Sequence, residues 1–142
     1  MEIGRVQASD LDAISRLHAH FWGEVSDPAA MSETLARLDG DSDHILLAAR
    51  IDGSCVGTVT GVVCHGLYGG SDSYLVIEDL VVDPEYRRTG VASALLGELE
   101  SLARARSCKQ MIVLTESCRD DAVGLYEAAG FAGRWTGFKK KL

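Results

Sequence analysis

The chain has 142 residues, of which 46% are hydrophobic and 25% charged, and its formal net charge is −7. This length and composition predict one globular domain over residues 1–142, and the acidic balance argues against a nucleic-acid partner. No apolar run approaches the ~20 residues of a membrane span, the N-terminus lacks a signal-peptide pattern, and four cysteines without a CxxC spacing are typical of reduced cytoplasmic thiols.

Two helices are predicted near the N-terminus. Ser9 and Asp10 can cap the first, whose apolar stripe consists of Leu11, Ile14, Leu17 and Phe21. Residues 26–40 predict the second, with Pro28 in its first turn and Gly40 as its stop.

Three strands are expected next. Residues 44–51 predict a strand, Asp-Gly at 52–53 a hairpin turn, and residues 54–64 the returning strand. A glycine-rich loop over 65–73 precedes a further strand over 74–82.

The C-terminal half predicts a helix, a strand and another helix. The first helix follows a turn at 83–86, and its inward residues are Val91, Leu95, Leu96, Leu99 and Leu102. Residues 109–115 predict a buried strand, and residues 117–130 hold a helix with a capping box at Ser117 and Asp120. The inward residues of that helix are Ala122, Leu125, Tyr126 and Ala129, and Gly130 ends it. One or two final strands are expected within 131–142, so the fold class is mixed α/β with one sheet.

The stretch YRRTGVASALLGEL at 86–99 places two arginines and a glycine before a helix. A helix N-terminus offers unpaired N–H groups and the positive end of the helix dipole, which suit a phosphate. Gly90 permits close backbone approach, and Arg87 and Arg88 add charge-assisted donors. The pattern is compatible with a pyrophosphate cradle or with an ordinary turn that carries surface arginines.

Two motifs resemble those of the GNAT N-acetyltransferase superfamily. Arg87-Arg88-Thr89-Gly90-Val91-Ala92 is similar to its [Q/R]-x-x-G-x-[G/A] motif, and AVGLYEAAGF at 122–131 resembles A-x-x-[LF]-Y-E-x-x-G-F. The resemblance implies a mostly antiparallel sheet flanked by helices, and acetyl-CoA as cosubstrate. It also implies that strands 74–82 and 109–115 splay apart, so that acetyl-CoA and an amine enter from opposite sides.

The resemblance also assigns cofactor contacts. The backbone of Leu80, Val81 and Val82 would bond the pantetheine arm, and the N–H groups of residues 88–92 would hold the pyrophosphate. Many family members carry Asn where this chain has Arg119. Arg119 is therefore a cofactor contact, an acceptor-anion contact or a surface residue, in that order of preference.

The chemistry needs a base, because only about one alkylammonium ion in 2,500 is deprotonated at pH 7 when its pKa is near ~10.4. Glu78 and Asp79 are candidates, but regular pleating sends them to opposite faces, so both serve one cleft only if the strand is bulged. The pair resembles spermidine/spermine and glucosamine-6-phosphate N-acetyltransferases, which implies deprotonation by Glu78 and substrate binding by Asp79. Two carboxylates on a solvated strand face are the alternative.

A proton donor for the leaving thiolate is also needed. Tyr126, with a reference pKa of ~10, can provide it, or it is simply a core aromatic residue. His65 is a minor candidate base, Cys118 is a bystander, and the scattered histidines argue against a metal site. His18 and His20 lie on the first helix, which in the family helps to form the acceptor pocket.

These observations favour an acetyl-CoA-dependent N-acetyltransferase that acts on a small-molecule amine by direct attack. A protein N-terminal or lysine acetyltransferase is one alternative, and a non-catalytic acetyl-CoA sensor is another. Family habits and exposed final strands favour a homodimer.

Overall fold

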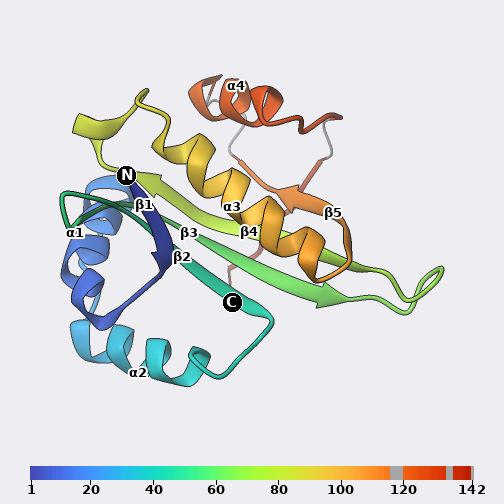
Figure 1. The fold of residues 1–142 in the computed structure, drawn as a ribbon, viewed down its shortest axis with the longest axis horizontal. Coiled ribbons are helices and arrows are strands. Elements are labelled where there is room, and N and C mark those ends of the chain that lie inside the picture. The colour runs from blue at the N-terminus through green and yellow to red at the C-terminus, as the bar shows by residue number, and fades with distance from the viewer. Residues whose placement is uncertain (116–119, 134–135, 142) are drawn as a thin grey trace.

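The protein folds around one five-stranded sheet in the order β1-β2-β3-β4-β5 (Figure 1). The structure is a computed structural model, which describes residues 1–115, 120–133 and 136–141. The first four strands pair antiparallel, and β5 pairs parallel with β4. The expected mixed, mostly antiparallel sheet is therefore confirmed. In the described part of the chain, no helix has the length and apolarity needed to cross a membrane.

The N-terminal elements are β1 (Glu2–Arg5), α1 (Leu11–Trp22) and α2 (Pro28–Leu38). Asp10 was expected to cap α1, but its side chain makes no such hydrogen bond. Its buried carboxylate instead accepts the N–H of Gln7 and forms an ion pair with Arg50 of the neighbouring sheet. The bond to Gln7 belongs to a capping box of the short 3₁₀ helix Ala8–Asp10 that precedes α1, and Arg50 neutralises the buried charge.

A tight hairpin joins β2 (His44–Ile51) to β3 (Ser54–His65). Its two turn residues, Asp52 and Gly53, have φ angles of 49° and 80°. Two positive φ angles are what a type I′ hairpin turn requires, so the Asp-Gly prediction is confirmed. The next strand, β4 (Ser73–Val82), pairs with β3 over nearly its whole length.

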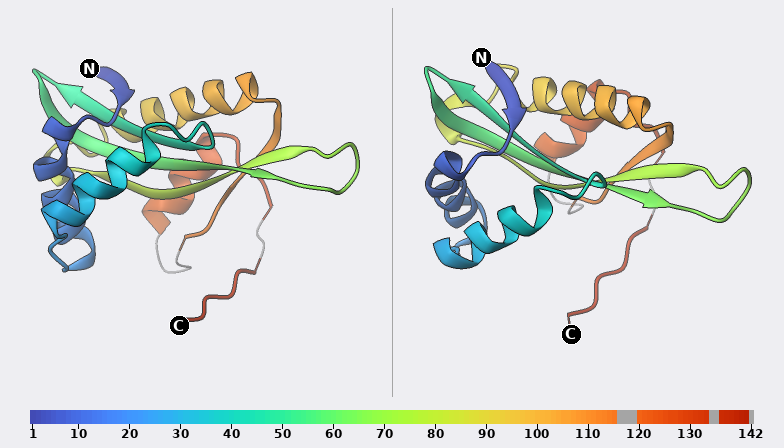
Figure 2. Two further views of the ribbon diagram at one scale, coloured as in Figure 1. Left: turned by 90° about the horizontal axis from the view of Figure 1, so that it is seen from below. Right: turned by 60° about the horizontal axis from the view of Figure 1, so that its bottom comes forward.

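Helices cover both faces of the sheet. Figure 2 shows α3 (Val91–Ala105) on one face and α1 and α2 on the other. The α3 face holds the core, where four of the five side chains predicted to point inward from α3 are fully buried: Val91, Leu95, Leu96 and Leu99. Leu102 is only partly buried against this cluster.

The strand β5 (Cys108–Val113) was expected to be buried and is not. Ile112 is 37% exposed, and Leu114, just beyond the strand, is 63% exposed. The reason is topological, because β5 lies at the end of the strand order and pairs only with β4 among the described residues.

The helix α4 (Asp120–Ala128) ends in a Schellman motif. Gly130 has φ 87° and donates its N–H to the backbone carbonyl of Glu127. The N–H of Phe131 donates to the backbone carbonyl of Tyr126. The rings of Tyr126 and Phe131 meet edge to face with centroids 5.6 Å apart. Ala129, expected to point inward, is exposed, and Ser117 lies outside the described residues.

No strand forms in the described C-terminal residues, 131–133 and 136–141, so the expected final strands are not seen there. Gly133 has φ 83°, a left-handed conformation that interrupts an extended strand. Three successive exposed lysines follow at 139–141, and Figure 2 shows this segment leading away from the sheet.

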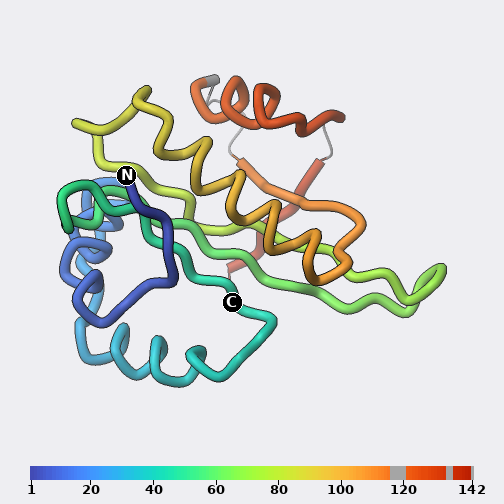
Figure 3. The backbone as a smooth tube through the Cα atoms, in the orientation of Figure 1, coloured from blue at the N-terminus to red at the C-terminus, as the bar shows by residue number. Residues whose placement is uncertain are grey.

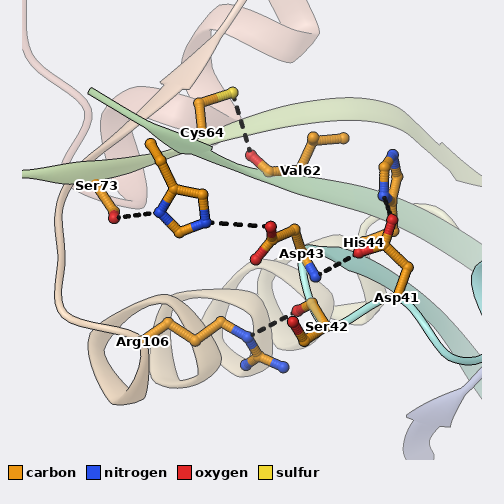
Figure 4. A network of polar contacts seen from close by, with 9 residues as sticks. Asp41, Ser42, Asp43, His44, Val62, Cys64, Ser73 and Arg106 are labelled. Carbon is orange, nitrogen blue, oxygen red and sulfur yellow. Dashed lines mark hydrogen bonds and ion pairs between the residues drawn. The ribbon is translucent and has the colours of Figure 1, made fainter. Parts of the chain in front are cut away.

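The hairpin between β3 and β4 extends beyond the rest of the sheet (Figure 3), and polar contacts link the elements at that end (Figure 4). His65, the last residue of β3, bonds Ser73 of β4 and Asp43 of the loop before β2. The same loop contacts α3, because Arg106 donates to the carbonyl of Ser42. This network, made by residues 41–44, 65, 73 and 106, fastens the end of the sheet opposite the candidate site.

Candidate functional site

The strands β4 and β5 separate halfway along β4. Their pairing runs from Ser73↔Cys108 to Ile77↔Val113 and stops there. The strand β4 continues to Val82, whereas β5 ends at Val113. The outer edge of residues 78–82 therefore has no strand partner among the described residues. The pairing ends where the predicted splay would begin.

A β-bulge lies at the point of separation. Thr60 stands opposite Glu78 and Thr58 opposite Val81, so Val59 faces two residues, Asp79 and Leu80. Asp79 has φ 52°, the left-handed conformation that a residue in a bulge can require.

The bulge reverses which residues of β4 face the core. Leu75 and Val82 both lie on the α3 side, near Leu99 and Val91 respectively. Their separation of seven residues would place them on opposite faces of a regular strand. Because the bulge adds one residue, Leu80 and Val82 lie on the same face of the sheet as Leu75 and Ile77 and pack against the same core cluster.

Both candidate carboxylates are consequently exposed at the same place. Glu78 and Asp79 are adjacent exposed residues between buried Ile77 and buried Val81. The condition stated from the sequence, that only a bulge allows both acids to serve one cleft, is met.

The loop before α3 adopts an unusual backbone. Arg88 and Gly90 have φ angles of 62° and 91°. The side chain of Arg87 donates to the backbone carbonyl of Val82 at 3.4 Å. The hydroxyl of Thr89 donates to the backbone carbonyl of Tyr86 at 2.7 Å. These contacts fix the loop against the end of β4.

The N–H groups of residues 88–92 have no hydrogen-bond partner in the described part of the chain. The first helical N–H to be paired is that of Ala94, which donates to Gly90. Nothing lies within 4 Å of a Cβ built on Gly90, so the space above the loop is open. Val91 is 1% exposed and anchors the helix in the core, which leaves only its backbone for a ligand. Free N–H groups at a helix N-terminus fit the phosphates of a coenzyme.

Tyr126 is half-buried on α4 and packs, with Leu125 and Phe131, against the core cluster. The Schellman motif sets the position of its ring, because Phe131 follows the left-handed Gly130 and meets the ring directly. Gly130 and Phe131, the last two residues of the family-like motif, therefore have a physical role in orienting Tyr126. Arg119 and Cys118 lie outside the described residues.

His65 does not accompany the carboxylates. It pairs with Ser73, five residues before Glu78 on β4, which corresponds to roughly 17 Å along a strand. Its ring is engaged by Ser73 and Asp43 in the network of Figure 4. The minor candidate base therefore lies at the other end of the strand. In the described residues, no group of three or more His, Cys, Asp or Glu could hold a metal ion.

His18 of α1 is a polar residue to which the sequence assigned no role of its own. Its Nε2 is buried and has no hydrogen-bond partner among the described residues. Burial lowers the pKa of His18, and the negative charge of Asp79 opposes that change. The side chain therefore lies near the bulge. The position of His18 within α1 indicates only which face of the helix it occupies. Its proximity to Asp79 could not be read from that position, because the two residues are some sixty positions apart in the sequence.

Comparison with known proteins identifies the class. Residues 11–131 match the family model described as acetyltransferase (GNAT) family. An acetyltransferase of Yersinia pestis (strain Pestoides F) is 30% identical over 129 residues, which cover 89% of this chain and 84% of the relative. The chain therefore belongs to the GNAT family of acetyltransferases, and membership implies acetyl-CoA as the acetyl donor.

Solved structures of low identity share the fold. Glucosamine-6-phosphate N-acetyltransferase from Arabidopsis thaliana aligns with a TM-score of 0.84 at 15% identity, over 99% of this chain and 97% of that one. An aminoglycoside acetyltransferase from an uncultured soil metagenomic sample, in complex with sisomicin, aligns with a TM-score of 0.82 at 19% identity, over 99% and 95%.

Proposed function

We propose that this acetyltransferase transfers the acetyl group of acetyl-CoA to the primary amine of a small molecule, by direct attack with both substrates bound. The observation that carries the proposal is the open half of β4. There, two exposed carboxylates on a bulge lie beside an unpaired strand edge and beside the free N–H groups before α3.

The donor site combines two backbone features. The edge at Leu80, Val81 and Val82 would bond the pantetheine arm as an added strand does, and residues 87–92 would hold the pyrophosphate. Arg87 and Arg88 are exposed and can add charge-assisted donors. Arg119, from the segment outside the described residues, stays a proposed further contact. Bound acetyl-CoA supplies the activated acetyl thioester.

The proton transfers are assigned to two side chains. Glu78 is the general base that helps to deprotonate the acceptor ammonium. Tyr126 is the general acid that donates its proton to the departing sulfur, and the hydroxyl must retain that proton at neutral pH to do so. Each role requires only that the side chain reach the reacting atoms from the side where β4 and β5 separate.

The acceptor is proposed to be a cationic small molecule. Asp79 supplies negative charge beside the base, and the chain as a whole carries a net charge of −7. Two proteins of the same fold are named for small acceptors that bear amino groups, glucosamine 6-phosphate and the aminoglycosides.

The proposal includes a cytoplasmic homodimer. In the described part of the chain β5 has no second strand partner, and Ile112 and Leu114 expose apolar surface even though Gly137 lies beside Leu114. Free edges and apolar surface are features that association removes. Light scattering at micromolar concentration should give twice 15.2 kDa, and a mass of about 15.2 kDa would contradict the dimer.

Two measurements test the activity. A panel of polyamines, aminoglycosides, aminoalkylphosphonates and peptides, read out by release of free thiol, should show turnover of at least one small amine. Turnover of peptides alone would favour a protein acetyltransferase, and acetyl-CoA binding without any turnover would favour a sensor.

The second measurement tests the cradle. Acetyl-CoA should raise the melting temperature of the wild-type protein by mass action. Gly90→Asp should abolish that shift, because a carboxylate would face the pyrophosphate. Gly90→Ala is the matched control, since it places the same strain at φ 91° without adding charge. An equal shift in folded Gly90→Asp and Gly90→Ala would remove the cradle from the proposal.

A further inference from the structure

An unpaired nitrogen lies beneath the acceptor side of the site. The Nε2 atom of His18 is buried without a partner in the described part of the chain. Buried polar atoms in native proteins nearly always have a hydrogen-bond partner, and those that lack one are concentrated where a ligand or water completes the bond. This atom therefore calls for a partner that the described residues do not supply.

The surroundings of His18 point toward the acceptor. The residue lies on α1, on the sheet face opposite α3, and α1 packs on β3 and β4 (Figure 2). Asp79, on the bulge of β4, is the charged group that acts on the His18 ring. No other titratable side chain is found to influence it among the described residues of the elements packed against α1.

Trp22 packs against the His18 ring at the end of α1. Its indole meets His18 edge to face with centroids 5.0 Å apart and is 49% exposed. Trp22 is the last residue of α1, and Gly23 ends the helix with φ 79°. Displacement of this one half-exposed side chain at a helix end would uncover part of the His18 ring without disturbing the core.

The chemistry of amide formation leaves one proton without an assigned acceptor. An alkylammonium loses two protons on becoming a secondary amide, while the N–C bond forms, the C–S bond breaks and the sulfur gains one proton. In the proposed function Glu78 takes the first proton and Tyr126 supplies the proton on sulfur. Glu78 then carries a proton and cannot accept the second before releasing the first.

We propose that the Nε2 of His18 accepts the second proton from the acceptor nitrogen, and that Asp79 stabilises the imidazolium that forms. This inference rests on the proposed function of the site. Burial keeps the imidazole neutral before the reaction by lowering its pKa, and a neutral imidazole is the form that can accept a proton. After the reaction His18 returns its proton to solvent, and the proton on Glu78 is exchanged for the one that Tyr126 gave to sulfur, so each turnover releases one proton overall.

The kinetic test compares His18→Gln with His20→Gln. Gln places an amide group near the position of Nε2 but cannot accept a proton, and His20 is an exposed residue of the same helix. With spermidine and sisomicin as acceptors, His18→Gln should lower kcat by at least ~10²-fold, with KM within about threefold of wild type. The acid limb of the wild-type kcat profile should change its midpoint in His18→Gln, where Glu78 alone still titrates as a base, and stay unchanged in His20→Gln.

The outcomes separate the two proposals. A wild-type enzyme that acetylates spermidine or sisomicin, with a His18→Gln profile that superimposes on its own, overturns the role of His18 alone. A uniform loss of rate with an unchanged profile would show a structural role and also overturn it. Failure of the wild type to acetylate any small amine overturns the proposed function, and the inference falls with it.

A binding measurement keeps the inference testable if His18→Gln does not fold. In the wild-type protein with CoA, addition of spermidine should move the ¹⁵N chemical shift of His18 Nε2 and leave that of His20 unchanged. An unmoved His18 signal, in a protein that acetylates spermidine, would contradict the inference.

Discussion

The two halves of β4 differ in almost every physical respect. Residues 73–77 are paired on both sides, by β3 and by β5, with a register shift against β5 between Ser73 and Leu75, and Leu75 and Ile77 are buried. Residues 78–82 are paired only with β3 among the described residues, begin with two exposed carboxylates and contain a bulge with a left-handed Asp79. One strand therefore serves as core at one end and as binding surface at the other.

The bulge makes this combination compatible with a single hydrophobic core. It exposes Glu78 and Asp79 side by side and then returns Leu80 and Val82 to the α3 face. A regular strand would have to give up either the second carboxylate or the packing of its last residues. The comparison predicts that substitutions around residues 78–82 reduce turnover with little loss of unfolding free energy. Substitutions beside residues 73–77 should lower the unfolding free energy with little effect on turnover.

The largest expected effect on the chemical side is that of Tyr126→Phe. The variant keeps the ring and its contact with Phe131, so acetyl-CoA should still raise its melting temperature. Its turnover should fall by ~10²–10⁴-fold, because the general acid is removed. Tyr74→Phe, in the paired half of β4, is the control and should retain wild-type turnover. Equal rates for the two variants would return Tyr126 to the role of a core aromatic residue.

The next effect is that of Glu78→Gln, measured as kcat/KM against pH. The rate at pH 7 should fall by ~10²-fold or more, since the base is lost. The ratio of wild-type to variant kcat/KM should shrink by about 100-fold between pH 7 and pH 9 for an amine of pKa ~10.4, because the free amine becomes more abundant. Glu98→Gln, an exposed residue of α3, is the matched control. A variant with the wild-type profile would place the base elsewhere.

Gly61→Val should affect stability without affecting chemistry. Gly61 pairs with Ile77, and a Cβ built on it would lie 2.6 Å from Leu99. Overpacking of this kind costs about 1–3 kcal/mol of unfolding free energy, which denaturant titration measures. Gly97→Ala is the control, because nothing lies within 4 Å of its Cβ and alanine favours the helix. A loss of acetyl-CoA affinity larger than the loss of stability would contradict the division between the halves.

The smallest effect is expected for Asp79→Asn. Asparagine tolerates the left-handed conformation, so the bulge should persist with an unchanged melting temperature. Loss of one exposed carboxylate should raise KM for spermidine by about two- to fivefold, the equivalent of ~0.5–1 kcal/mol. Asp72→Asn, in the hairpin loop beyond the paired half, should leave KM unchanged. Because Asp79 is also proposed to stabilise the His18 imidazolium, kcat should fall as well, and a constant KM would contradict its role in acceptor binding.

Local sequence signals predicted most of the fold. The strand over 44–51 and the Asp-Gly turn were placed correctly, because an apolar run bounded by turn residues is a local signal. The helix after Gly90 was likewise clear from its spacing of leucines. The errors concern long-range partners. The run at 109–115 is apolar enough for a buried strand, but the sheet ends there.

The site was predicted less completely. The motif at 87–92 indicated the loop, and the adjacent acids at 78 and 79 indicated that a bulge was needed. His18 could not be given a role, because its significance depends on a contact between α1 and β4 that no spacing within the helix encodes. The Schellman motif at Gly130 is the opposite case, because the adjacent Gly130 and Phe131 are enough to predict this helix end from local sequence.

The open edge of β4 has a consequence for how such a protein can diversify. Because its hydrogen-bonding groups belong to the backbone, they persist whatever side chains occupy Leu80 and Val82, provided the core stays filled. If acetyl-CoA binds there as proposed, the donor site is insulated from most point mutations. His18, Trp22 and Asp79 do not contribute these backbone groups. In the proposed site, substitutions of these side chains would alter acceptor preference in single steps while binding of the acetyl donor is inherited unchanged.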